Sequence, residues 1–173
     1  MVILQTDRLT LSTLSTEDAP FILELLNTPN WLRYIGDRGV FTLQGAEDYI
    51  QQGPHKSYAR FGFGLWRVAR TEDNLSLGVC GLLKRDTLDH PDIGFAFLPE
   101  HEGQGLAFES SHAVLAYAAA ALRLKRIIAI TTEENRRSLN LLARLGLNFE
   151  KMITLPGQQQ EFVLFGKELL AGE

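Results

Sequence analysis

The sequence predicts a fold of the α+β class, with mixed α/β character, from two observations. Residues 92–98, DIGFAFL, are apolar on both alternating faces, which is typical of a central strand covered on both sides. A helical stretch and a second apolar strand follow this segment, whereas the other expected strands pair as hairpins joined by short turns. We therefore expect one strand-helix-strand crossover within an otherwise antiparallel arrangement.

In the amino-terminal half, leucines alternate with Thr10 and Ser12, and this period of two predicts a strand. The polar stretch STED follows, and Ser15 or Thr16 can accept a hydrogen bond from a free N–H group at a helix start. Pro29 is expected to end that helix. The elements expected here are a strand over residues 8–14, a helix ended by Pro29, an irregular segment over 30–39, a helix over 43–52 stopped by Gly53-Pro54, and hairpin strands over 61–69 and 76–84.

In the carboxyl-terminal half, Val114, Leu115 and Ala118 share one stripe at helical spacing, which predicts an amphipathic helix. A later helix is expected to end at Gly146, because glycine readily adopts the left-handed conformation of a helix C-terminus. No repeat or linker interrupts the chain, so we expect a single domain over residues 1–173 with its core at about 6–170. The expected elements are a helix over residues 107–122, a strand over 127–132, a helix over 135–145, and strands over 149–155 and 162–169.

The composition of the chain argues against several classes of protein. The chain has 173 residues and a net charge of −4, which argues against a protein that binds nucleic acid through phosphate contacts. Cys80 is the only cysteine, so an internal disulfide is impossible and a reducing compartment such as the cytoplasm is expected. The amino-terminal residues lack a signal-peptide pattern, and no apolar run approaches the roughly 18 residues of a membrane span, so we expect no membrane partner.

The stretch EHEGQGLAFESS, residues 100–111, places Gly103 and Gly105 directly before a predicted helix. Free N–H groups and the partial positive charge of a helix start favour an anion, and glycines let the backbone approach it. A plain turn between a strand and a helix is the alternative. The chain lacks the Gly-Lys-Ser/Thr of the Walker motif, and Phe108 stands where the dinucleotide fingerprint requires glycine. The sequence therefore disfavours both kinds of nucleotide site.

The longer segment DIGFAFLPEHEGQGLAFES, residues 92–110, resembles motif A of the GNAT superfamily of N-acetyltransferases. The family pattern is Arg/Gln-x-x-Gly-x-Gly/Ala, and Glu102, Gly105 and Ala107 occupy its three marked positions. Glu102 departs from the pattern. The stretch GQGLAFES is similar to the GKGYATEA form of the ribosomal-protein N-terminal acetyltransferase (RimJ/RimL-like) branch, in which the first position is often not basic.

Two further segments carry the same resemblance. NRRSLNLLARLGL, residues 135–147, resembles the family's Asn-x-x-Ala/Ser…Leu-Gly-Phe block, with Asn135 and Ser138 on its first two marked positions. TDRLTLSTLSTEDA, residues 6–19, resembles the opening of the ribosomal branch. The resemblance therefore covers nearly the whole chain.

The resemblance implies direct transfer of an acetyl group from acetyl-CoA to a primary amine, of a protein N-terminus or a small molecule, through a ternary complex. It implies a central, twisted, mostly antiparallel sheet of about six to seven strands flanked by about four helices. It implies no metal ion, and either a monomer or a homodimer. The residues expected to bind acetyl-CoA are Phe97, Leu98, Gly103, Gln104, Gly105, Leu106, Ala107, Phe108 and Asn135.

Ser138 and Asp92 are the candidates for proton transfer. Many relatives place a tyrosine seven residues after the position of Asn135 as the donor to the leaving thiolate, but this chain has Leu142 there. Ser138 is the candidate in its place, although helix starts also favour serine for capping alone. Asp92, at the head of the central strand, is the candidate general base, with a strand-end carboxylate in solvent as the alternative.

Other side chains have weaker or different roles. His90 and Glu47 are weaker candidates for the base, and Cys80 is expected to be a small buried residue rather than a nucleophile. In the family, the segment that follows the first helix varies with substrate, which implies that it contacts the acceptor. In this chain that segment contains the residues expected on the acceptor side, Trp31, Tyr34 and Arg38.

Two other functions remain open. Leu142 and Glu102 also fit a non-catalytic acyl-CoA-binding module or sensor on the same fold. The glycine turn alone would also permit a phosphate-binding α/β domain unrelated to CoA.

Overall fold

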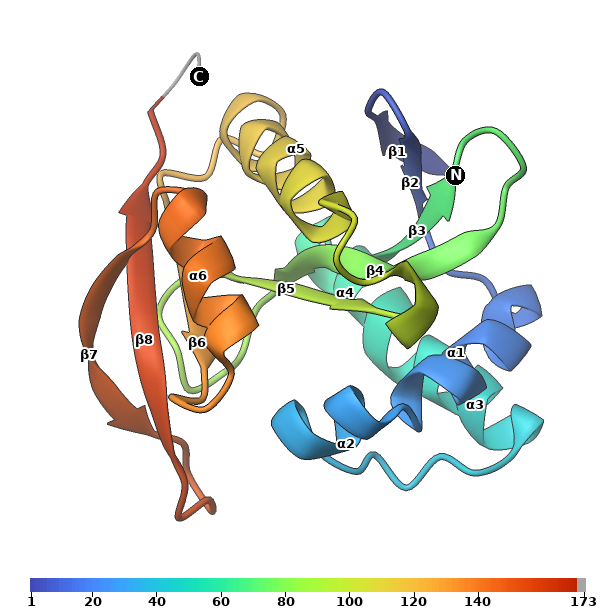
Figure 1. The fold of residues 1–173 in the computed structure, drawn as a ribbon, viewed down its shortest axis with the longest axis horizontal. Coiled ribbons are helices and arrows are strands. Elements are labelled where there is room, and N and C mark those ends of the chain that lie inside the picture. The colour runs from blue at the N-terminus through green and yellow to red at the C-terminus, as the bar shows by residue number, and fades with distance from the viewer. Residues whose placement is uncertain (171–173) are drawn as a thin grey trace.

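The computed structural model describes residues 1–170, so the last three residues of the predicted domain 1–173 lie outside the described part. Its strands form one sheet in the order β1-β2-β3-β4-β5-β6-β8-β7 (Figure 1). Neighbouring strands are antiparallel except β5 and β6, which confirms the predicted class and crossover. The strands are β1 Val2–Gln5, β2 Leu9–Ser12, β3 Leu65–Arg70, β4 Ser76–Leu83, β5 Asp92–Phe97, β6 Arg126–Thr131, β7 Asn148–Thr154 and β8 Glu161–Glu168.

The edge strand β1 is the additional element in this sheet. Residues 1–170 form eight strands, one more than the upper limit of the expectation. β1 pairs with β2 through Leu4 opposite Leu11, and the register shifts between Val2 and Leu4. A strand of four residues is too short to show a period of two, so its pairing rather than its own pattern defines it.

β5 and β6 separate soon after they meet. Within residues 1–170 their only paired residues are Asp92 and Ile128, and the Ile128 N–H donates to the Pro91 carbonyl at 3.0 Å. β5 continues beside β4, whereas β6 continues beside β8. The two halves of the sheet therefore splay apart at its centre (Figure 1).

Helices cover both faces of the sheet. α1, α2 and α3 lie on one face, and α5 and α6 lie on the other (Figure 1). Ile22 and Ile50 pack with Val79 in the first core, and Val114 packs with Trp66 in the second, larger core. No helix within residues 1–170 is long and apolar enough to span a membrane. The helices are α1 Ala19–Leu26, α2 Pro29–Tyr34, α3 Leu43–Ile50, α4 Lys56–Phe61, α5 Leu106–Ala120 and α6 Arg136–Arg144.

The prediction of an irregular segment over residues 30–39 is wrong for its first part, which is helix α2. The Thr28 hydroxyl accepts a hydrogen bond from the Trp31 N–H at 3.4 Å and so caps the helix start. Pro29 occupies the first helical position, where a missing N–H has no partner to lose. Pro29 therefore begins a second helix in addition to following the first one.

The predictions of a helix stop at Gly53-Pro54 and of a strand from Phe61 are also wrong. α3 runs into a π-helical turn, Gln51–His55, and then into α4. The π-turn accommodates Pro54, which has no N–H to donate. Gly62, with φ of 77°, ends α4 in the left-handed conformation, and β3 begins only at Leu65.

Candidate active site

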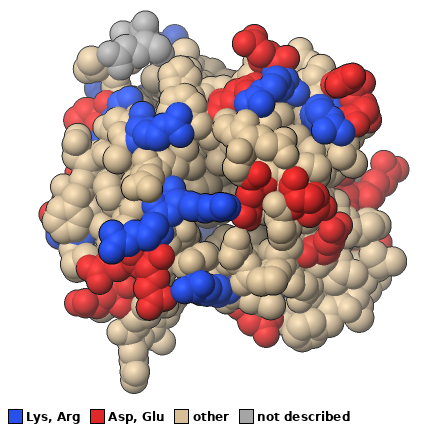
Figure 2. All heavy atoms as spheres, in the orientation of Figure 1, with Lys and Arg blue, Asp and Glu red and all other residues tan. Residues whose placement is uncertain are grey.

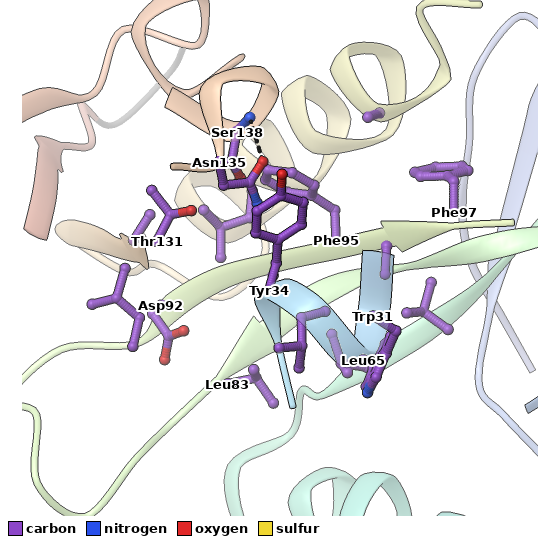
Figure 3. A pocket seen from close by; sticks show the side chains of 18 of the residues that line it. Trp31, Tyr34, Leu65, Leu83, Asp92, Phe95, Phe97, Thr131, Asn135 and Ser138 are labelled. Carbon is purple, nitrogen blue, oxygen red and sulfur yellow. Dashed lines mark hydrogen bonds between the residues drawn. The ribbon is translucent and has the colours of Figure 1, made fainter. Parts of the chain in front are cut away.

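A cleft of about 1190 Å³ lies where β5 and β6 diverge. The loop after β5 that contains Gly103 and Gly105 (the glycine loop) and the start of α6 line the cleft from one face of the sheet, and α2 and α4 line it from the other. Leu155, Gln158 and Phe162, around the turn between β7 and β8, line it as well. Figure 3 shows Asp92 of β5 and Asn135 and Ser138 at the start of α6 among the residues around this cleft. The splayed sheet thus brings together residues that lie far apart in the sequence.

The backbone of β5 presents N–H groups to the cleft. The Leu98 N–H donates to the Leu77 carbonyl of the neighbouring chain segment at 2.9 Å. Because N–H groups alternate in direction along a strand, those of Phe95 and Phe97 face away from β4 and toward the diverging β6. Leu98 is buried in the core beneath α1 and does not line the cleft, which differs from the expectation for that residue.

The glycine loop is open. Gly103 and Gly105 have φ of 75° and 77°, the left-handed region that favours glycine, and Gly105 directly precedes α5. A Cβ atom at Gly103 would meet nothing within 4 Å, and at Gly105 it would approach only Arg8 Nη2, at 3.6 Å. The free N–H groups at the start of α5 therefore have room for an anion.

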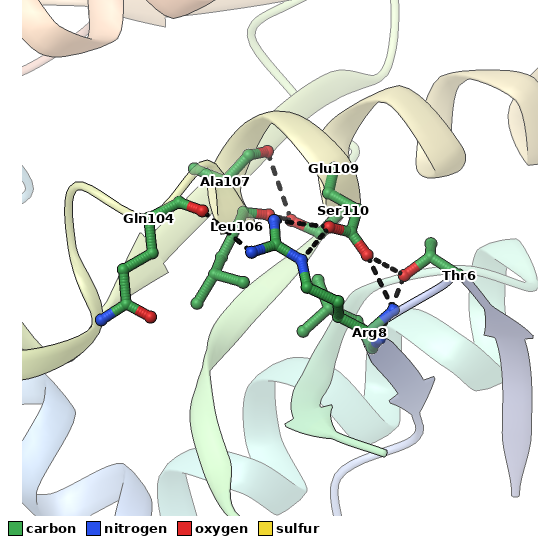
Figure 4. Close-up of polar contacts among 8 residues, drawn as sticks. Thr6, Arg8, Gln104, Leu106, Ala107, Glu109 and Ser110 are labelled. Carbon is green, nitrogen blue, oxygen red and sulfur yellow. Dashed lines mark hydrogen bonds and ion pairs between the residues drawn. The ribbon is translucent and has the colours of Figure 1, made fainter. Parts of the chain in front are cut away.

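A polar network holds the acidic residue of the first turn of α5 in place. Glu109 accepts hydrogen bonds from Thr6 Oγ1 at 2.6 Å and from Arg8 Nε at 2.7 Å (Figure 4). Arg8 Nη1 also donates to the Gln104 carbonyl at 3.1 Å. Partial burial by itself would raise the pKa of Glu109. The hydrogen bonds from Thr6 and Arg8 and the charge of Arg8 together outweigh it, so the pKa of this carboxyl is lowered. The side chain of Gln104 does not line the cleft, which leaves its backbone N–H group for the expected contact with acetyl-CoA.

Glu102 joins three elements at the entrance of the cleft. Arg137 Nη1 of α6 lies 2.6 Å from Glu102 Oε2, and Asn30 Nδ2 of α2 donates to Glu102 Oε1 at 3.2 Å. The carboxylate that stands where the family has Arg or Gln is therefore engaged by a cation and an amide. No local sequence pattern predicts this contact, because Arg137 lies 35 residues further along the chain.

The start of α6 presents a hydroxyl to the cleft. Asn135 Oδ1 accepts a hydrogen bond from the Ser138 N–H at 3.3 Å, so Asn135 caps the helix. The Ser138 hydroxyl makes no side-chain hydrogen bond within residues 1–170, and Ser138 lines the cleft. Leu142 is 1% exposed and supplies no proton donor at the position where many relatives have tyrosine.

Asp92 is buried at the base of the cleft, which excludes the alternative of a carboxylate in solvent. It is 2% exposed, and burial raises its pKa to about 6 despite the opposing charge of Arg85. Arg85 Nε lies 3.4 Å from Asp92 Oδ1. Sequence reasoning missed Arg85, although Leu83 pairs opposite Asp92 in the hairpin and so places Arg85 nearby. His90 and Glu47 do not line the cleft.

The predicted acceptor residues reach the cleft in different ways. Trp31 is 5% exposed and packs in the core beneath α1, whereas Tyr34 is half-buried and Arg38 is exposed. Tyr58 of α4 does not line the cleft; its hydroxyl donates to the Leu65 carbonyl, and burial raises its pKa to about 12. The predicted site residues that line the cleft are Trp31, Tyr34, Arg38, Asp92, Phe97, Gly103, Gly105, Leu106, Ala107, Phe108, Asn135 and Ser138.

Cys80 is a buried core residue, as predicted. It is fully buried, and its thiol lies 3.6 Å from the Ser111 hydroxyl. Burial raises the pKa of the Cys80 thiol to about 11, so the nucleophilic thiolate is scarce at neutral pH. Within residues 1–170, no three His, Cys, Asp or Glu side chains gather as a metal site requires.

The chain is similar to known acetyltransferases in sequence. Residues 8–148 match a family model described as an acetyltransferase (GNAT) domain. The chain is 28% identical over 152 residues to the uncharacterized N-acetyltransferase YoaA of Bacillus subtilis (strain 168), a match that covers 87% of this chain and 85% of YoaA. It is 31% identical over 118 residues to the ribosomal protein uS5-alanine N-acetyltransferase of Escherichia coli (strain K12), over 64% of this chain and 58% of that protein.

The fold agrees with these sequence matches. The solved structure of RimL, a ribosomal L7/L12 alpha-N-protein acetyltransferase in complex with coenzyme A, matches with a TM-score of 0.83 over 98% of both chains, at 17% identity. The family model covers the glycine loop, the diverging strands and the start of α6. The chain therefore belongs to the GNAT family of N-acetyltransferases.

Proposed function

We propose that residues 1–173 form a single catalytic domain that transfers an acetyl group directly from acetyl-CoA to a primary amine in a ternary complex. The observation that carries this proposal is one continuous cleft, with an open anion loop at one end and a buried carboxylate, Asp92, at its base. A phosphate-binding module needs the loop but has no use for the carboxylate. The amine belongs to a protein N-terminus or a small molecule.

The loop and α6 would hold the phosphates of acetyl-CoA. The N–H groups between Gly103 and Phe108 supply donors, and Arg136, Arg137 and Arg144 supply positive charge along the same side of the cleft. Asn135 and Ser138 line the path from these groups toward β5. The thioester of the bound cosubstrate would then lie between the start of α6 and the diverging strands.

Asp92 is the proposed general base. An amine attacks only as the neutral form, so its ammonium must first lose a proton. A carboxylate with a pKa of about 6 is ionised at neutral pH yet accepts a proton more readily than an ordinary aspartate. The neutral amine nitrogen then forms a bond to the carbonyl carbon and the C–S bond breaks. Asp92 holds the proton that the ammonium lost, and the second proton, released from nitrogen as the amide forms, passes to the departing thiolate to give the free CoA thiol.

The charge that develops on the other two reacting atoms also needs donors. The N–H groups of Phe95 and Phe97 face the cleft and can polarise the thioester carbonyl. The Ser138 hydroxyl can donate a hydrogen bond to the departing thiolate, in place of the tyrosine that Leu142 replaces. Strand pairing holds Asp92 and the N–H groups of Phe95 and Phe97 in place, and the capped start of α6 holds Ser138. Little reorganisation of these four groups is therefore required during the reaction.

Binding of acetyl-CoA tests the first half of the proposal. Acetyl-CoA at about 100 times its Kd should stabilise the protein by about 2.7 kcal/mol, which raises the Tm by roughly 5 to 10 °C. Gly105→Glu puts a side chain and a negative charge into the loop and should abolish this shift. Gly62→Glu is the matched control, because Gly62 has the same φ of 77°, has open space around it, and lies outside the cleft.

Release of free CoA thiol with a panel of amines and N-terminal peptides tests the second half. An enzyme releases thiol with at least one acceptor, and Asp92→Asn slows the release roughly 10²- to 10⁴-fold. The alternative, a non-catalytic acyl-CoA-binding module, rests on two observations: Leu142 replaces the usual donor, and Glu102 replaces Arg or Gln. That alternative predicts a Tm shift with acetyl-CoA but no thiol release with any amine.

A further inference from the structure

The cleft is far more positive than the protein that contains it. Eight Lys and Arg residues line it against three Asp and Glu residues, whereas the whole chain carries a net charge of −4. Figure 2 shows both cationic and anionic side chains at the rim of the hollow at the centre of this face. The excess of cations among the lining residues raises the local concentration of an oppositely charged ligand.

Acetyl-CoA accounts for only part of this charge. Three of the eight cations, Arg136, Arg137 and Arg144, belong to α6 on the phosphate side. The other five lie on the opposite, acceptor side, in the segment after α2, in α4 and after β4. They are Arg38, Lys56, Arg60, Lys84 and Arg85.

Two of these five have their charge engaged inside the protein. Lys84 Nζ donates to the carbonyl oxygens of Arg85, at 2.8 Å, and of Leu88. Arg85 is paired with Asp92. Their positive charges are therefore committed to holding the loop after β4 and the buried carboxylate.

The positive charges of the other three, Arg38, Lys56 and Arg60, have weak or no pairing with carboxylates of the described chain. Arg60 Nη1 lies 3.9 Å from Asp86 Oδ1, but both side chains are exposed, at 69% and 86%, so the pair is weak. Arg38 and Lys56 make no ion pair and no side-chain hydrogen bond with any residue of the described chain. The three carboxylates that line the cleft within residues 1–170, Asp92, Glu102 and Glu134, are paired with Arg85, Arg137 and Arg33, so none of them is paired with Arg38 or Lys56.

We propose that the acceptor is a primary amine that carries an anionic group, a carboxylate or a phosphate, near the amine. This inference rests on the proposed acetyl transfer. The ammonium would approach Asp92 at the base of the cleft, and the anionic group would lie against Arg38, Lys56 and Arg60. A polyamine would bring a second positive charge to these three cations, and so the site selects against it.

Matched acceptors test the charge preference. Phosphoethanolamine is compared with ethanolamine, and a peptide with glutamate at its second and third positions is compared with the same peptide carrying glutamine or lysine there. Binding to the CoA-loaded protein is measured by calorimetry, and thiol release is measured with acetyl-CoA. At least one anionic acceptor should be favoured over its neutral counterpart roughly tenfold in kcat/KM and in affinity, and the preference should fall as salt is added.

Variants locate the preference. Arg38→Gln and Lys56→Gln should each reduce the preference for the anionic acceptor over its neutral counterpart roughly threefold. Lys125→Gln is the control, since Lys125 is exposed and lies outside the cleft. The phosphate and peptide pairs distinguish a small-molecule acceptor from an acidic protein N-terminus.

The two proposals fail in different ways. Equal use of charged and neutral acceptors, or a preference for the lysine peptide or spermidine, would overturn the anionic acceptor and leave acetyl transfer intact. Preferential binding of an anionic acceptor without any thiol release would contradict the acetyl transfer and support the anionic ligand. If none of the anionic acceptors binds the CoA-loaded protein at millimolar concentration, the inference is wrong.

Discussion

Asp92→Asn should make the protein more stable at neutral pH while it removes the activity. Burial is the main cause of the raised pKa of Asp92, so the folded state disfavours the charged carboxylate. Asparagine has nearly the same shape and cannot ionise. The substitution therefore relieves the cost of the buried charge and removes the proposed base at the same time.

The size of the effect follows from the pKa. The shift from 3.8 to about 6 spans about two pH units, and each unit corresponds to 1.36 kcal/mol, which gives about 3 kcal/mol. Below pH 4, Asp92 is protonated in both the folded and the unfolded states, and the cost is absent. Between about pH 4 and pH 6 only the unfolded state loses the proton, so wild-type stability falls with rising pH. Above pH 6 the cost is complete and constant.

Urea unfolding of both proteins between pH 4 and pH 8 measures this difference. The free energy of unfolding of the variant minus that of the wild type should rise by about 3 kcal/mol between pH 4 and pH 7 and then remain level. Asp86→Asn, an exposed carboxyl in the loop after β4, reports the effect of the net charge alone. A difference between Asp92→Asn and wild type that does not change over this range would refute the account of Asp92.

The same residue governs the pH dependence of catalysis. The kcat/KM of the wild type should fall below an apparent pKa near 6, because protonated Asp92 cannot accept the proton of the amine. In the variant kcat should fall by roughly 10²- to 10⁴-fold, the usual contribution of a general base. Thiol release as a function of pH checks both, and an unchanged acid limb in the variant would assign the base to another group.

Three further predictions concern single side chains. Ser138→Ala should lower kcat roughly tenfold or more with unchanged Tm and acetyl-CoA affinity, because the hydroxyl caps nothing; a normal kcat would leave Ser138 as a residue of the helix start only. Glu102→Gln should tighten acetyl-CoA binding several-fold in calorimetry, since it removes a negative charge and frees Arg137, and should change stability by less than about 1 kcal/mol because Arg137 is 75% exposed. Cys80 should not react with Ellman's reagent in the native protein but should react after denaturation, and rapid native labelling would contradict its burial and its pKa of about 11.

The sequence predicts the central elements better than the proline-containing ones. β5 is apolar on both faces and α5 is a long stretch with one apolar stripe, so their type and approximate bounds follow from local sequence alone. Pro29 and Pro54 mislead because proline stops one helix and starts or tolerates another, depending on the residues before it. Thr28 as a cap decides the first case, and the π-turn decides the second. Both depend on backbone geometry that propensity does not encode.

Some residues of the candidate site could likewise be predicted from local sequence, and others could not. Gly103, Gly105 and the helix start are neighbours in sequence, so the loop can be recognised without a structure. The burial of Asp92 and its contact with Arg85 depend on the pairing of β4 with β5. The cluster of cations on the acceptor side comes from three separate segments, and only the folded chain brings them to one cleft. No local pattern could have predicted it.

The place where the two halves of the sheet meet also fixes where they can turn. Asp92 with Ile128 is the sole backbone pair between β5 and β6 within residues 1–170, so a relative rotation of the two halves, if it occurs, would have its pivot near this pair. Points near a pivot move least, and points far from it move most. Opening of the entrance between the glycine loop and α6 would therefore displace the phosphate-binding groups while Asp92 keeps its position. A wide nucleotide could enter and leave such a cleft without moving the base that the reaction needs.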